Sequence, residues 1–265
     1  MHLPNFALRR QQNVNNTQKS SRYTLLDTLR GIALVSMILY HGTWDLVYAF
    51  GVKLSWFPSN FSHIWQQSIC QTFILLSGFC FSLGKHRLKR GLIVFGAGLL
   101  VSISTCIFMP QSKILFGVLT LIGASMLIMV PLARPLEKIN PYVGTTASLL
   151  LFWLTRRITK GIIGFGSLEL LRLPKWLYHS YATAFIGFPK TGFRSSDYFP
   201  LFPWIFLFIA GFFIYRIFKR HDILRRLPSV SLPLFAFVGK HSLIAYLLHQ
   251  PIVYGALYVI FNIFR

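Results

Sequence analysis

Long apolar stretches alternate with short polar segments along the chain from about residue 24 onward. Most of these stretches are about 20 residues long, the length that an α-helix needs to cross a bilayer. The pattern predicts an all-α, polytopic integral membrane protein with about seven transmembrane helices in one bundle. The expected spans cover residues 24–50, 66–84, 91–109, 114–133, 142–155, 200–218 and 240–262.

The composition supports this class. Hydrophobic residues make up 54% of the 265 residues and charged residues only 12%, about half the charged share of a soluble domain. There are 27 Lys and Arg against 6 Asp and Glu, a net charge of +21. The basic residues lie between apolar stretches, where they suit anionic lipid head groups better than a nucleic-acid-binding face. We therefore expect the lipid bilayer as a partner, and no nucleic acid.

The polar start of the chain sets the expected domains and orientation. Residues 1–21 contain "QQNVNNTQKSS" and lack the apolar core of a signal peptide. We interpret them as a disordered cytosolic tail that precedes a transmembrane domain at residues 22–265. Basic residues in the tail and in two of the connections place the N-terminus inside the cell. Residues 156–199 break this rule, since they are expected outside and are also basic. A re-entrant or interfacial helix is an alternative there.

Four ionisable residues interrupt the first span: Asp27, Arg30, His41 and Asp45. On a helical wheel at about 100° per residue, they fall within a stripe about 60° wide. The stripe is expected to face the bundle interior or a watery cavity, because a charge at lipid depth costs roughly 2.5–3.5 kcal/mol.

The same spacing predicts two local pairs in the stripe. Asp27 and Arg30 are one turn apart, as are His41 and Asp45. A histidine beside a carboxylate can serve as a general base, because the carboxylate fixes the tautomer of the ring. Alternatively, the first pair anchors the inner end of the span, and His41 is an interior histidine with satisfied hydrogen bonds.

Several motifs along residues 24–255 resemble one known superfamily. They are "LDTLRGIALVSMILYH", "FILLSGFCFSLGKHRLKRG", "DYFPLFPWIFLFIAGFFI" and "GKHSLIAYLLHQP". Their order resembles that of the transmembrane acyltransferases, and most closely the bacterial members of the heparan-α-glucosaminide N-acetyltransferase catalytic domain family. The resemblance implies transfer of an acyl group from cytosolic acetyl-CoA or another acyl-CoA. The acceptor would be a hydroxyl or amine of a sugar-like or other envelope molecule at the bacterial inner membrane.

The resemblance also suggests which histidine is the base. The superfamily's Arg-to-His spacing maps onto Arg30 and His41. In the lysosomal N-acetyltransferase the active histidine follows the first helix, which makes His63 in "FSHIWQQ" the second candidate. We favour His41 because of Asp45 and its position inside the span.

The remaining candidates would bind the donor and the acceptor. Near Arg30, the basic run after the second span is expected to bind the phosphates of acyl-CoA. Its members are Lys85, Arg87, Lys89 and Arg90. Asp27, Asp197 and His249 are the expected acceptor-binding residues. Asp197 is alternatively a helix cap before the sixth span. His249, next to Pro251, is alternatively a packed polar residue at a helix contact.

The sequence offers little evidence for other kinds of site or function. The three cysteines lie in apolar stretches without metal-ligand spacing, and no metal is expected. The rival function is a transporter or exporter of a small anionic or lipid-linked molecule, because charges inside a membrane also mark substrate paths. The chain shows no internal repeat that would favour an inverted-repeat transporter. Coenzyme A binding would separate the acyltransferase from the transporter and from a non-catalytic membrane partner.

Overall fold

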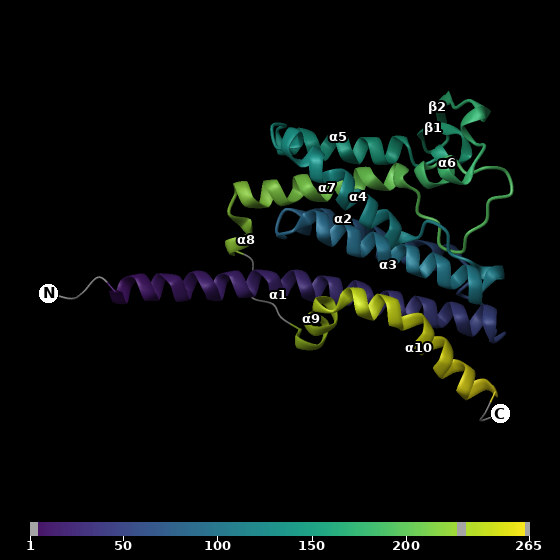
Figure 1. The fold of residues 1–265 in the computed structure, drawn as a ribbon, viewed down its shortest axis with the longest axis horizontal. Helices are drawn as coiled ribbons and strands as arrows, with labels where there is room; N and C mark the ends of the chain where they lie inside the picture. The colour runs from purple at the N-terminus through teal and green to yellow at the C-terminus, as the bar shows by residue number, and fades with distance from the viewer. Residues whose placement is uncertain (1–4, 227–231, 263–265) are drawn as a thin grey trace. The chain divides into compact units, whose positions relative to one another are not determined.

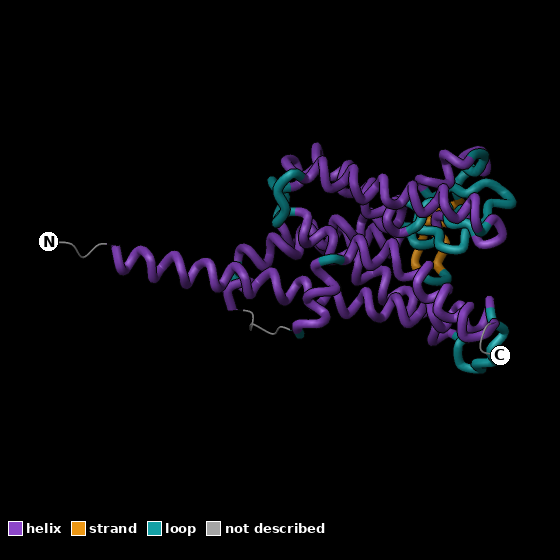
Figure 2. Tube along the Cα trace, turned by 60° about the horizontal axis from the view of Figure 1, so that its bottom comes forward, coloured by secondary structure: helices purple, strands orange, loops and turns teal. Residues whose placement is uncertain are grey.

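A computed structural model describes residues 5–226 and 232–262 of the chain, which are mostly helical (Figure 2). The chain divides into two compact units, one formed by residues 1–73 and 218–265 and the other by residues 74–217. The all-α class is therefore confirmed in outline. The single bundle remains a prediction.

The first unit is built around one long helix. It contains α1 (Asn5–Trp44), a π-helical turn (Asp45–Ala49), the first half of α2 (Asn60–Phe81), α8 (Ile223–Arg226), α9 (Pro233–Lys240) and α10 (Ser242–Asn262). Both α9 and α10 pack along α1, although about 200 residues separate them from it in sequence (Figure 1). The helix α1 begins at Asn5, so its backbone is helical in a segment that we expected to be a disordered tail.

One face of α1 forms the core of the first unit. Leu34 and Met37 are buried together with Ile69 of α2. The indole Nε1 of Trp65 donates a 2.8 Å hydrogen bond to Ser36 Oγ and joins the two helices beside this cluster. Leu39, by contrast, is 60% exposed. The apolar spacing of i, i+3 and i+4 therefore buries one side of the helix and leaves apolar residues on another, as expected in lipid.

The backbones of α1 and α9 approach each other closely at two glycines. A Cβ atom on Gly31 would lie 1.9 Å from the carbonyl oxygen of Phe235. A Cβ atom on Gly239 would lie 1.8 Å from the carbonyl oxygen of Asp27. Small residues are the usual way for membrane helices to pack at short range. The contact between α1 and α9 therefore requires glycine at both positions.

The second unit contains the remaining long helices. Its elements are the end of α2, α3 (Arg87–Phe108), α4 (Val118–Leu136), α5 (Pro141–Leu154), α6 (Tyr181–Ile186) and most of α7 (Leu201–Arg220). The helix α4 is the most enclosed and packs along α3. The ring of Phe81 packs against Phe208 and Phe212 of α7, with centroids 6.1 and 6.4 Å away. This aromatic cluster forms much of the core of the unit.

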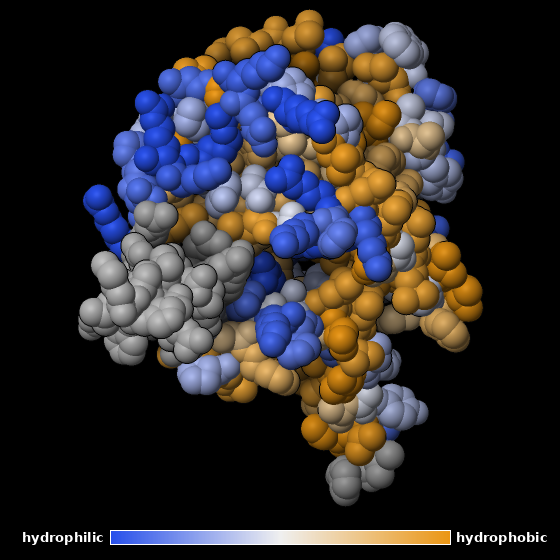
Figure 3. All heavy atoms as spheres, turned by 60° about the vertical axis from the view of Figure 1, so that its left-hand side comes forward, coloured by the Kyte–Doolittle hydropathy of each residue, from blue (hydrophilic) through white to orange (hydrophobic). Residues whose placement is uncertain are grey.

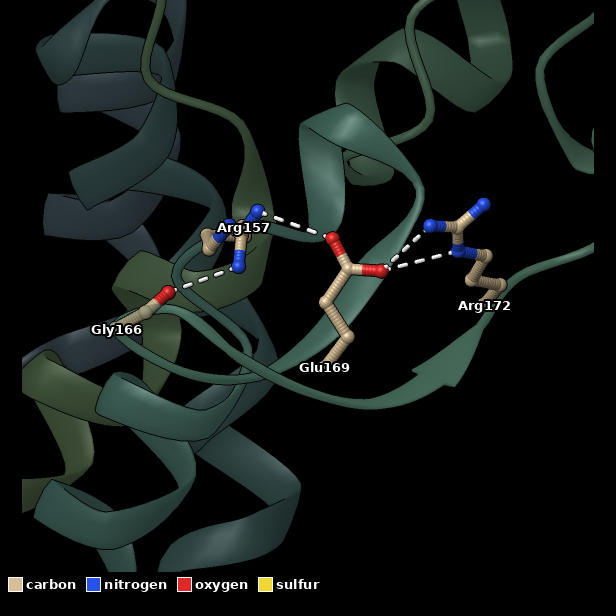
Figure 4. Close-up of polar contacts among 4 residues, drawn as sticks. All are labelled: Arg157, Gly166, Glu169 and Arg172. Carbon is tan, nitrogen blue, oxygen red and sulfur yellow. Dashed lines mark hydrogen bonds and ion pairs between the residues drawn. The ribbon is translucent and has the colours of Figure 1, made fainter.

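A short antiparallel hairpin lies between α5 and α6, formed by β1 (Ile162–Phe165) and β2 (Leu168–Arg172). Gly166, at φ 54°, supplies the left-handed residue that a tight two-residue turn needs. Glu169 forms ion pairs with Arg157 at 3.4 Å and Arg172 at 2.8 Å, and Arg157 also donates to the Gly166 carbonyl (Figure 4). We did not expect strands here. The candidate helix in this segment is the six-residue α6.

Five helices in the described part of the chain are long and apolar enough to cross a membrane. They cover Thr24–Ala49, Arg87–Phe108, Val118–Leu136, Leu201–Arg220 and Ser242–Asn262. The expected spans at residues 66–84 and 142–155 are helical, as α2 and α5, but α2 begins with many polar residues and α5 has only 14 residues. A helix of that length rises about 21 Å, less than the roughly 30 Å of a hydrocarbon core. The count of seven spans is therefore not confirmed.

The exposed surface is of the kind expected for an integral membrane protein. Apolar side chains form broad continuous areas, and polar ones gather in patches (Figure 3). Along α3, Leu100, Ile103 and Ile107 are each more than half exposed. A soluble monomer seldom exposes such a continuous apolar face. The exposed residues of α3 therefore support burial in a bilayer.

Candidate functional site

Two histidines meet where α1 and α10 pack together. His41 lies in the last turn of α1, and His249 lies in the middle of α10, two residues before Pro251. Their ring centroids are 5.1 Å apart, and the rings are inclined at 54°. His249 is 8% exposed. The sequence placed these residues in separate roles, and the structure brings them into contact.

The carboxylate of Asp45 is bound to α10. Asp45 is 1% exposed and begins the π-helical turn after α1. Its two oxygens accept hydrogen bonds of 3.0 and 2.9 Å from Nε2 of Gln250. Among the residues described, no hydrogen bond joins Asp45 to His41. The expected His41–Asp45 pair is therefore not formed, and Gln250 is the partner that the pattern of residues did not predict.

A second set of contacts fixes His249. Its Nδ1 lies 2.6 Å from the carbonyl oxygen of Tyr246, one turn earlier in α10. Its Nε2 is buried and has no hydrogen-bond partner in residues 5–226 and 232–262, and the same holds for Oε1 of Gln250. The first unit thus contains a buried polar cluster of four side chains inside an apolar environment. We call His41, Asp45, His249 and Gln250 the junction cluster.

The other pair in the stripe forms as predicted. Arg30 Nη1 lies 2.7 Å from Asp27 Oδ1, and the two side chains are 22% and 27% exposed. The same nitrogen approaches the carbonyl oxygen of Gly239 at 3.5 Å. This geometry fits an anchor between α1 and α9. Donor binding by Arg30 and acceptor binding by Asp27 remain proposals.

The surroundings of His63 differ from those of the junction cluster. It is exposed in the first turn of α2, and none of the hydrogen bonds and ring contacts that involve the described chain has it as a partner. A general base is usually held in place by a second group. His63 therefore has weaker geometric support than the two histidines of the cluster.

The four basic candidates surround the start of α3 in the second unit. Arg87 is the first residue of the helix, and its guanidinium lies 5.0 Å from the centroid of the Phe81 ring. Lys85, Lys89 and Arg90 are exposed, and no acidic residue lies in the first turn. A helix N-terminus already carries partial positive charge. The added cations make this region suitable for an anion.

Asp197 caps a different helix from the one we expected. Its carboxylate accepts a hydrogen bond from the backbone N–H of Val118, the first residue of α4, rather than capping α7. Nearby, Ser195 Oγ accepts from the N–H of Leu115 at 2.9 Å. Loss of surrounding water raises the pKa of Asp197 to about 6. The capping alternative thus explains this residue within the second unit, and acceptor binding remains a proposal.

Comparison with known proteins identifies one family. The sequence model of the family described as "Heparan-alpha-glucosaminide N-acetyltransferase, catalytic" matches residues 22–251, most of the chain. No curated protein and no solved structure matches the chain. The matched range contains the whole junction cluster as well as both sets of charged candidates.

Proposed function

Because the chain belongs to the heparan-alpha-glucosaminide N-acetyltransferase catalytic family, we propose that it is a membrane-embedded, acyl-CoA-dependent acyltransferase. The acyl group is acetyl, and it passes to a hydroxyl or amine of a sugar-like or other envelope acceptor. The observation that carries the proposal is the junction cluster, which places two histidines and a carboxylate inside a membrane helix pair. Ionisable groups within membrane-spanning helices are costly and are usually retained for function.

A histidine of the cluster serves as the general base, with His41 as the first candidate. The acceptor proton passes to the imidazole while the acceptor oxygen or nitrogen attacks the carbonyl carbon of the thioester. The carbon–sulfur bond breaks, and the coenzyme A thiolate takes a proton from the imidazolium. Such proton transfer contributes about 10²- to 10⁴-fold to rate. His249 lies against His41, with the ring centroids 5.1 Å apart.

The basic residues at the start of α3 bind the phosphates of the donor. Lys85, Arg87, Lys89 and Arg90 supply the cations, and the N-terminus of α3 adds its partial positive charge. Because acyl-CoA is cytosolic, the start of α3 faces the cytosol in this proposal. The pattern of basic residues supports a cytosolic N-terminus, and we propose the bacterial inner membrane as the location.

The transporter remains the alternative, because a polar cluster between membrane helices also suits a substrate path. Binding and turnover of acyl-CoA distinguish an acyltransferase from a transporter. Purified protein in detergent is incubated with radiolabelled acetyl-CoA and glucosamine, and transfer is compared among wild type, His41→Ala and His63→Ala. We expect transfer by wild type and by His63→Ala, and a loss of at least 100-fold in His41→Ala. A wild type that neither binds coenzyme A nor turns it over would favour the transporter.

A further inference from the structure

The hairpin between α5 and α6 contains a β-bulge that decides which side chains share a face. Ile163 lies opposite Leu171 in the ladder, whereas its neighbour Gly164 lies opposite Glu169. Leu170 therefore has no counterpart in β1 and is the bulged residue. In a regular strand, residues three apart point to opposite faces. Across this bulge they point to the same face.

One face of the hairpin is apolar and exposed. Phe165 lies opposite Leu168, and Ile163, two residues before Phe165, lies opposite Leu171. Partners in an antiparallel ladder point to the same side of the sheet, so these four side chains share a face. Phe165, Leu168 and Leu171 are 41%, 59% and 57% exposed. The hairpin thus presents an apolar patch to its surroundings.

The opposite face is charged. Glu169 and Arg172 form an ion pair at 2.8 Å although they are three apart in β2, as the bulge allows. Arg157, from the segment after α5, approaches the same carboxylate at 3.4 Å (Figure 4). The hairpin is therefore amphipathic. A two-stranded hairpin alone is only marginally stable in water, and an exposed apolar face adds to that cost.

The hairpin lies next to a surface that suits lipid. Its first strand contacts α5 (Figure 1). The last turns of α5 expose Leu150, Leu151 and Trp153, in the manner of the exposed residues of α3. Trp176, which is 71% exposed, follows four residues after β2. Tryptophan is enriched at the boundary between membrane and water. The position of the hairpin therefore fits the level of the lipid head groups.

The charge around the hairpin favours an anionic surface. Residues 156–175 contain five basic residues and one acidic residue. The basic ones are Arg156, Arg157, Lys160, Arg172 and Lys175. A second copy of the chain that paired through the same face would bring two such clusters together, and like charges repel. Anionic lipid head groups instead attract them.

We infer that the hairpin is an interfacial anchor, which inserts Phe165, Leu168 and Leu171 among the lipids and holds anionic head groups with the surrounding basic residues. Its depth follows from its backbone. Both strands have open edges, and open sheet edges do not occur in the hydrocarbon region, where no water can pair with them. The hairpin therefore lies at the level of the head groups. This interaction surface is independent of the proposed acyl transfer.

Spin labelling of the full chain in nanodiscs tests the depth of each face. The nanodiscs contain phosphatidylcholine and phosphatidylglycerol, and the native cysteines are replaced by alanine. A nitroxide is attached at Leu168→Cys, Leu171→Cys or Arg172→Cys. Oxygen relaxes labels in lipid, and a water-soluble nickel chelate relaxes labels in water. We expect oxygen to dominate for Leu168→Cys and Leu171→Cys, and nickel to dominate for Arg172→Cys.

The pattern of the three labels tests the bulge and the insertion together. Strict alternation along β2 would group Leu168→Cys with Arg172→Cys and separate both from Leu171→Cys. That grouping would overturn the inference, and so would dominance of nickel at all three positions. Spin–spin broadening of Leu168→Cys that disappears on dilution with unlabelled protein would identify a second copy as the partner. This result would also overturn the inference.

The contribution of charge is measured with the same label at Leu168→Cys. We expect Lys160→Gln with Lys175→Gln to lower the ratio of lipid-immersed to hydrated label, by about fivefold for each lysine removed. Nanodiscs of phosphatidylcholine alone should lower it as well. Lys138→Gln, an exposed lysine in the connection before α5, is the control and should have no effect. An equal ratio in all of these samples would overturn the assignment to anionic lipid.

Discussion

Asp45 and Gln250 are joined across 205 positions of sequence by two hydrogen bonds, in which Nε2 of Gln250 donates to both carboxylate oxygens of Asp45 at 3.0 and 2.9 Å. The carboxylate is 1% exposed, so these bonds replace the hydrogen bonds that water would otherwise donate to it. The pair links the end of the first span to the middle of the last one.

Removing Gln250 should destabilise the protein by leaving a buried carboxylate without its donor. We expect Gln250→Leu to lower the free energy of unfolding by about 2–3 kcal/mol. Asp45→Asn should lose less, about 1 kcal/mol, because its amide oxygen still accepts one bond from Gln250. Unfolding in mixed micelles with increasing denaturing detergent measures both values.

A double variant provides the control for this prediction. In Asp45→Leu with Gln250→Leu no buried carboxylate remains, so its destabilisation should be smaller than the sum of those of the single variants Asp45→Leu and Gln250→Leu by at least 1 kcal/mol. Strict additivity would mean that the two side chains do not interact energetically.

Gly31 should tolerate no side chain, because α9 lies against it. A Cβ atom there would lie 1.9 Å from the carbonyl oxygen of Phe235, so Gly31→Ala must push the two backbones apart. We expect a loss of about 1–3 kcal/mol, the usual range for overpacking. Gly255→Ala in α10 is the matched control, since nothing lies within 4 Å of its added Cβ. Equal stability of the two variants in the same unfolding assay would contradict the close contact.

The stripe on the first span was predictable because α-helical periodicity relates residues a turn apart. It placed Asp27 beside Arg30, and it placed His41 on an inward face. The pairing of His41 with Asp45 was wrong for a local reason. The helix widens into a π-helical turn at Asp45, so a wheel at 100° per residue no longer describes where that side chain points.

Contacts between distant segments could not be read from periodicity. Nothing in the spacing of α10 indicates that Gln250 pairs with Asp45, although a polar residue beside Pro251 in an apolar helix was a usable signal. Asp197 shows the same limit, since it caps α4, whose first residue is Val118, instead of the helix that follows it. Sequence spacing predicted a cap, but it could not show which helix end would lie nearby.

The basic residues at the start of α3 should determine the affinity for the donor. We expect Lys85→Gln with Lys89→Gln to raise the KM for acetyl-CoA about tenfold with kcat nearly unchanged, since two phosphate contacts are lost in both ground and transition states. The effect of salt on KM should weaken in this variant. Lys175→Gln, an exposed lysine in the segment between α5 and α7, is the control. A fall in kcat at constant KM would exclude a role in donor binding.

Asp197 should make stability depend on pH in a direction opposite to that of a salt-bridged carboxylate. Its pKa is about 6 in the folded protein, against 3.8 for the unperturbed group, because burial disfavours the charged form. The folded state therefore binds the proton more tightly than the unfolded state. The stability from this group is fully present below about pH 3.8 and is lost as pH rises through about 6.

The variant Asp197→Asn isolates this effect. Asparagine does not titrate and can still accept from the N–H of Val118 through its amide oxygen. Between pH 4 and pH 7, wild type should lose about 2 kcal/mol more stability than the variant. Glu169→Gln, which removes an exposed carboxylate of the hairpin, is the control and should follow wild type closely. Parallel stability curves for wild type and Asp197→Asn would show that this carboxyl titrates as it does in water, and the buried cap at α4 would then be wrong.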